Sequence, residues 1–175
     1  MSKHSVSFFA VSALFLASPA LAGSAPQAAL DKTVTLSWTT SGTSRRADGT
    51  SFGFSNVNTR IIYISSAGRP FVRISVRSKK LTREVNLAPD GRHGRSHVNF
   101  QGDKLVGVEL FDSGGRQYTA TFDPAFSSCS LSVIDAKSGG MKIKRWGPDG
   151  ATYELDNVST GSPTCSIQSG NAFSH

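Results

Sequence analysis

The chain has 175 residues, a formal net charge of +7 and two cysteines. This length suits one domain with its own hydrophobic core, and the surplus of basic residues favours anionic partners. Two cysteines cannot build a four-ligand zinc site, and Cys129 and Cys165 are too far apart for a Cys-x-x-Cys redox motif.

The N-terminal segment, residues 1–22, is typical of a cleavable signal peptide. It combines a basic start at Lys3, an apolar run over 8–16, and small residues at Ala20 and Ala22. The apolar run is shorter than the roughly 20 residues that span a bilayer, and no later run is long enough. We therefore expect an exported protein, periplasmic or secreted, with no transmembrane span after leader removal and a mature net charge of +6.

Residues 23–31 are rich in Ser, Ala, Pro and Gln and are predicted to be a disordered lead-in. From there a single β domain is expected over 32–175, because apolar and polar residues alternate with the period of a half-buried strand. The clearest alternating segments are Val34–Trp38, Val72–Val76, Val106–Leu110, Tyr118–Phe122 and Cys129–Val133. In the third of these, the pattern places Val106, Val108 and Leu110 in the core and Glu109 in solvent.

Turn clusters of Gly, Asp, Ser and Pro separate the predicted strands at intervals of about ten residues. This spacing predicts an all-β fold of 8–10 strands arranged as a single antiparallel meander. A calycin-like β-barrel is favoured over a β-sandwich.

The two cysteines are predicted to form one disulfide. Each shares a strand face with apolar neighbours, Cys129 with Leu131 and Cys165 with Ile167, and an exported chain meets an oxidising compartment. The bond would pin the last strand to the rest of the sheet and stabilise the fold by about 3–4 kcal/mol in the chain-entropy model. The alternative is a pair of reduced, buried thiols.

No catalytic, metal or cofactor motif is predicted. Residues 112–115, Asp-Ser-Gly-Gly, resemble the nucleophile segment of trypsin-like serine proteases, but the flanking residues and the chain length do not match, so a hairpin turn explains them better. His93 and His97 form a metal-like cluster without an identifiable third ligand. Glu109 and Glu154 are interpreted as solvent-facing carboxylates.

A basic stretch is the main candidate for binding. Between Arg60 and Arg95 lie nine basic residues and two acidic ones. Arg73 and Arg77 alternate with apolar residues, so they share an exposed sheet face, and the candidate binding residues are Phe71, Arg73, Arg77, Lys79, Lys80 and Arg83. The alternative interpretation is a solvated sheet edge that its charges protect from aggregation.

Arg83 has the parity of three apolar neighbours, so the pattern points it inward. A buried arginine is costly without a partner. Either the strand bulges there, which we favour, or Arg83 lines a cavity and meets an acid or an anionic ligand.

Three further segments, Tyr63–Arg69, Gln101–Gly107 and Cys165–Asn171, are similar to segments of small exported bacterial proteins to which no activity is assigned. The resemblance implies a bacterial, periplasmic or secreted setting and transfers no site residue.

Two function classes therefore stay open. One is an exported non-enzymatic binding or envelope-associated module for an anionic or amphiphilic ligand, such as an anionic glycan, a lipid or another polyanion. The other is a small extracytoplasmic hydrolase-type enzyme with an unrecognised site. The sequence does not predict an oligomeric state.

Overall fold

The computed structural model describes residues 24–78, 82–86, 97–111, 114–135, 143–146 and 152–173. The predicted signal peptide, the loop with His93, and Lys79 and Lys80 lie outside these residues. The elements are the 3₁₀ helix η1 (Gln27–Ala29) and strands β1 (Lys32–Arg46), β2 (Ser51–Ile64), β3 (Pro70–Arg77), β4 (Thr82–Asn86), β5 (His97–Gln101), β6 (Lys104–Phe111), β7 (Gly114–Phe122), β8 (Cys129–Asp135), β9 (Ile143–Trp146) and β10 (Thr152–Ser169). The predicted all-β fold is confirmed, and these ten strands fall within the expected number.

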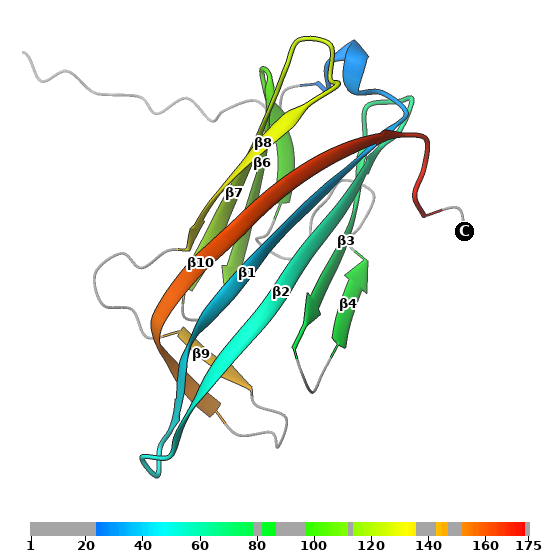
Figure 1. The fold of residues 1–175 in the computed structure, drawn as a ribbon. Helices are drawn as coiled ribbons and strands as arrows, with labels where there is room; N and C mark the ends of the chain where they lie inside the picture. Colours follow the sequence, from blue (N-terminus) through cyan, green and yellow to red (C-terminus); the bar gives the residue numbers. More distant parts are fainter. Residues whose placement is uncertain are drawn as a thin grey trace, which may run out of the picture.

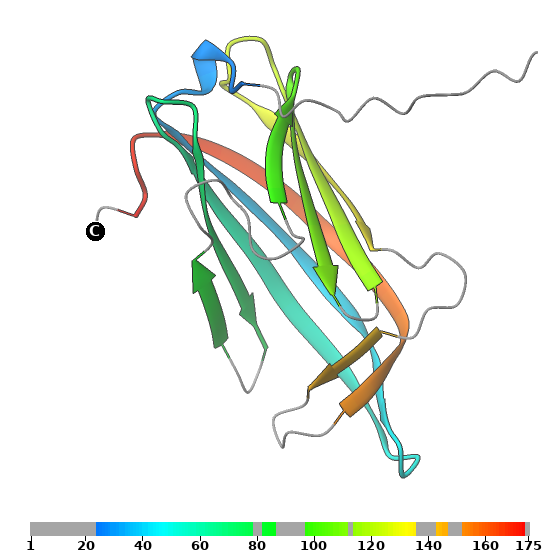
Figure 2. The same ribbon diagram turned by 180° about the vertical axis from the view of Figure 1, so that it is seen from behind.

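The strands form two antiparallel sheets that pack against each other. One sheet has the order β4-β3-β2-β1-β10-β9 and the other has the order β5-β6-β7-β8. The first lies in front in Figure 1, and the second lies in front in Figure 2, where the molecule is seen from behind. The favoured closed barrel is therefore not found among the described strands, which form a two-sheet sandwich instead.

The chain path also differs from the predicted single meander. The four strands β1–β4 form one meander and β5–β8 form a second, while β10 returns to pair with β1 along most of its length. β10 follows β1 closely only because it contains two bulges, where it has one residue more than its partner. Asn157 and Ser162 lie in these bulges, and both have a positive φ.

The hydrophobic core lies between the two sheets. Val34, Leu36 and Ile62 are fully buried in the first sheet, and Leu105 and Ala120 are fully buried in the second. The expected lead-in takes part as well, since η1 buries Ala29 completely against this core. The segment just before β1 thus contains a short 3₁₀ helix that contacts the core.

β6 has the opposite orientation to the one predicted. Its core-facing residues are Leu105, Gly107 and Glu109, since these pair with the inward residues of β7. Gly107 lies under the Tyr118 ring, and a Cβ atom there would come within 1.9 Å of the tyrosine Cζ. The alternation was ambiguous because Leu105 and Val106 are both apolar and both buried.

The predicted disulfide between Cys129 and Cys165 is present. Cys129 begins β8 and Cys165 lies in β10, so the bond joins the two sheets across the sandwich. The two Cα atoms are 5.7 Å apart, within the range usual for disulfides. The bond therefore ties the last strand to the opposite sheet and not merely to its neighbours.

Candidate functional site

β3 places the predicted arginines on the outer face, the side of the six-stranded sheet that is turned away from the second sheet. Val72 pairs with Ile62 and is buried in the core, so Arg73 and Arg77 point the opposite way. Phe71 lies on the same face, where its ring packs against that of Tyr63 with centroids 6.2 Å apart. The structure thus brings Phe71, Arg73 and Arg77 together as predicted.

Arg73 and Arg77 are the arginine pair of this site. They are four residues apart on one strand, or about 13 Å along it at about 3.3 Å per residue. The guanidinium carbon of Arg73 lies 4.9 Å from the centroid of the Phe173 ring, a cation–π contact with the C-terminal segment.

Of the other predicted binding residues, Lys79 and Lys80 lie outside the described residues. Arg83 belongs to β4 and pairs with Val76. The β3–β4 register runs from Arg73 opposite Asn86 to Arg77 opposite Thr82 without a shift, so the bulge favoured for Arg83 is not present in β4. The direction of the Arg83 side chain lies outside the described part of the structure.

Hydroxyl side chains cover the middle of the outer face. Outward positions on β1 are Thr35, Ser37, Thr39, Ser41 and Thr43. One row that crosses four neighbouring strands consists only of hydroxyl residues, and we call it the hydroxyl row: Ser75 on β3, Thr59 on β2, Ser37 on β1 and Thr164 on β10. It crosses β3 midway between the two members of the arginine pair.

The charges on this face are unevenly distributed. Arg69 and the arginine pair lie at the β3 side. At the far end of β1, Arg45 forms an ion pair with Asp156 at 3.1 Å, so its charge is compensated. Asp31 accepts a hydrogen bond from the Tyr63 hydroxyl at 3.0 Å and thereby raises the pKa of that phenol. Three described arginines of this face, Arg69, Arg73 and Arg77, therefore lie in or next to β3.

A buried ion pair inside the sandwich was not predicted. Arg60, 1 % exposed, reaches from β2 to Glu109 on β6, which is 5 % exposed. Its Nε donates to Oε1 at 2.5 Å and its Nη2 donates to Oε2 at 2.8 Å. Nη1 donates to the carbonyl oxygens of Thr59 and Ser75, so all the guanidinium nitrogens are engaged. The expectation of a solvent-facing Glu109 was wrong because the orientation of β6 had been inverted.

Arg116 brings a second guanidinium to the same carboxylate, with 3.8 Å between its Nη1 and Oε2 of Glu109. The Trp38 ring lies close to both guanidiniums, 4.8 Å from the Arg60 carbon and 5.4 Å from that of Arg116. Tyr118 packs beside Trp38, and its burial, followed by the charge of Glu109, raises the pKa of its phenol. The Arg60–Glu109 ion pair and the Trp38–Tyr118 contact therefore join the two sheets in the interior.

The cluster has no geometry for catalysis in the described residues. Glu109 accepts a bidentate hydrogen bond and cannot act as an accessible base, and no second carboxylate faces it. A signal for Arg60 did exist in the sequence, because Asn58 and Arg60 share the parity of Ile62 and Ile64. Interpreting it required knowing which strand lies opposite.

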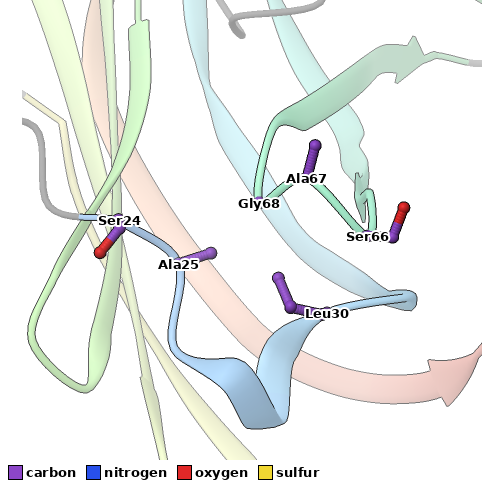
Figure 3. Close-up of a pocket in the computed structure, with 6 residues that line it drawn as sticks. All are labelled: Ser24, Ala25, Leu30, Ser66, Ala67 and Gly68. Carbon is purple, nitrogen blue, oxygen red and sulfur yellow. The ribbon is translucent and has the colours of Figure 1, made fainter.

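A small hollow lies where the segment before β1 meets the turn between β2 and β3 (Figure 3). It has a volume of about 230 Å³ and is lined by Ser24, Ala25 and Leu30 before β1 and by Ser66, Ala67 and Gly68 in the β2–β3 turn. Among the described residues, its lining contains two serines but no acid, histidine or lysine that would activate them, so these residues by themselves form no catalytic arrangement.

Two other features are absent from the described ranges. No group of three His, Cys, Asp or Glu residues is close enough to hold a metal ion. No helix there has the length and apolar character needed to cross a membrane. No protein-family model matches the chain, and no curated protein or solved structure is significantly similar to it.

Proposed function

We propose that the mature protein is an exported, non-enzymatic module that binds an anionic ligand on the outer face of the six-stranded sheet through Arg73 and Arg77. The observation that carries this proposal is the position of the arginine pair. Both side chains project from one strand onto the outer face, beside a field of hydroxyl groups. No described strand or helix covers this face of the sheet (Figure 1). The signal-peptide pattern of residues 1–22 supports export.

The place of β3 in the sheet argues against a purely protective role for these charges. Charged residues commonly guard the outermost strand of a sheet against edge-to-edge aggregation. β3, however, is hydrogen-bonded to β4 along one edge and to β2 along the other. Arg73 and Arg77 therefore lie on an internal strand, where edge protection does not require them.

The alternative of a small hydrolase lacks supporting geometry among the described residues. Glu109 is held by Arg60, and the hollow near Leu30 contains no activating base. A binding surface needs neither, because exposed guanidiniums and hydroxyls bind anions directly.

The test is the affinity for heparin, a densely anionic probe, measured by titration calorimetry on three forms of the mature protein. The Arg73→Ser/Arg77→Ser variant should bind about tenfold more weakly per arginine removed, since each charged hydrogen bond contributes about 1.5–3 kcal/mol. The control Arg45→Ser/Lys104→Ser loses the same net charge at exposed positions away from the arginine pair. Equal weakening of the two variants would show an effect of net charge alone and would overturn the proposal.

A further inference from the structure

Strand β8 forms an open edge of the four-stranded sheet. Its seven residues (Cys129–Asp135) all pair with β7, and no described strand pairs with its other side. The edge of a sheet carries unpaired N–H and C=O groups, so it is able to accept a strand from another chain. Natural proteins usually prevent such pairing with charges, prolines, bulges or a very short edge strand.

β8 lacks these protections along most of its length. Its only charged residue is the last one, Asp135, it contains no proline, and its register against β7 has no shift that would indicate a bulge. The other edge of this sheet, β5, is shorter, with five residues. The edge strands of the six-stranded sheet, β4 and β9, each contain adjacent charged residues: Arg83 and Glu84, and Lys144 and Arg145. Among the described edge strands, β8 is thus the one least protected against pairing.

The backbone groups on the open side of β8 include those of Leu131 and Val133. Phe122 donates its N–H to the carbonyl oxygen of Asp103 at 3.1 Å, on the β6 side of β7. In an antiparallel strand the N–H and C=O of one residue point to the same neighbour, and this direction alternates along the strand. Phe122 lies opposite Cys129, so that pair is not hydrogen-bonded, and the bonds to β7 come from Ser130, Ser132 and Ile134. The N–H and C=O groups of Leu131 and Val133 therefore point to the open side.

We propose that β8 pairs with β8 of a second copy of this chain, so that two four-stranded sheets join into one continuous sheet. Antiparallel pairing of a strand with its own copy has two-fold symmetry, which is the commonest symmetry of protein oligomers. The register that pairs the whole of β8 sets Ser132 opposite the partner subunit's Ser132. Leu131 then lies opposite the partner subunit's Val133, and each such pair exchanges two backbone hydrogen bonds.

The charge and exposure of β8 favour a second copy as the occupant. Because residues 129–134 are uncharged, the strand meets its own copy in this register without like charges opposite each other. Ile134, which is 61 % exposed, lies opposite the partner subunit's Ser130 and loses part of that exposure. A single strand pair gives a small interface, about 1,200 Å² or less, so we expect a dimer that dissociates on dilution. The arginine pair lies on the other sheet and takes no part in it.

The first test is sedimentation equilibrium of the mature protein, for which we expect a dimer with a Kd on the order of 10 µM. Ser132→Lys sets two lysines opposite each other across the two-fold axis and should weaken dimerisation about tenfold. The control Ser166→Lys makes the same change at an exposed position of β10, on the outer face of the other sheet, and should stay within about twofold of the parent. Both variants should keep the fold, since both serines are exposed.

The second test examines the register with single cysteines. Ser132→Cys should give a disulfide-linked dimer on air oxidation, because opposed residues of a pair without hydrogen bonds have Cα atoms about 4.5 Å apart, within disulfide range. In the control Ser130→Cys the two new thiols lie four residues apart along the strands, roughly 13 Å, and should not link.

Three results would overturn the proposed pairing: a parent that stays monomeric at about 200 µM, twenty times the expected Kd, equal dimerisation of Ser132→Lys and Ser166→Lys, or linkage of Ser130→Cys as fast as that of Ser132→Cys. Each of them leaves the arginine site untouched.

Discussion

Replacing Glu109 with glutamine preserves the size of the side chain but removes the negative charge that Arg60 contacts inside the sandwich. The two side chains are 2 % and 6 % exposed, so water cannot replace the lost charge. Removal of one partner from a buried ion pair costs about 3–5 kcal/mol, because the remaining charge stays buried without compensation. This is a large part of the roughly 5–15 kcal/mol that stabilises a typical domain.

The measurement is urea unfolding followed by far-ultraviolet circular dichroism. With a slope of about 2 kcal/mol per molar urea, Glu109→Gln should lower the unfolding midpoint by about 2 M. The control Asp103→Asn, at an exposed turn residue, should change the unfolding free energy by no more than about 0.5 kcal/mol. In the double variant Arg60→Met/Glu109→Leu the pair is replaced by apolar side chains, and much of the loss should be recovered. The stabilising role of the Arg60–Glu109 ion pair would be refuted if Glu109→Gln changed the unfolding free energy as little as the control does. It would also be refuted if the loss in the double variant equalled the sum of the losses in Arg60→Met and Glu109→Leu.

Two other predictions concern the disulfide and Tyr118. The mature protein should have an intact mass two hydrogens below the reduced value, and Cys129→Ala/Cys165→Ala should lower the unfolding free energy by about 3–4 kcal/mol; alkylation of both thiols without prior reduction would contradict the bond. Because burial raises the pKa of the Tyr118 phenol in the folded state, its contribution to stability is complete below the ordinary phenol pKa of about 10 and is lost as the pH rises above it. Tyr118→Phe should therefore lose less stability between pH 9 and pH 11 than the parent does, and an unchanged pH dependence would show that the phenol does not titrate on unfolding.

Much of the local structure could be predicted from the sequence. The alternation in Val34, Leu36 and Trp38 gave the correct core face of β1, and the same reasoning placed Arg73 and Arg77 outward on β3. These predictions succeed because side-chain direction in a strand depends on parity alone.

The assembly of the sheets could not be predicted in this way. Parity does not identify which strand lies beside which, so the return of β10 to β1 and the division into two sheets were not foreseen. The Arg60–Glu109 pair was missed for the same reason. Its partners are 49 positions apart in the chain, and the orientation of β6 had been misassigned because its residues 105 and 106 are both apolar.

The most direct test of the arginine site is the salt dependence of heparin binding. The logarithm of the binding constant should fall linearly with the logarithm of the salt concentration, since each contacted charge on the polymer releases counterions. Relative to the parent, Arg73→Ser/Arg77→Ser should have a slope smaller by about two, one unit for each lost contact, whereas Arg45→Ser/Lys104→Ser should keep the slope of the parent. If both variants lost the same amount of slope, or neither lost any, the arginine pair would not be the binding site.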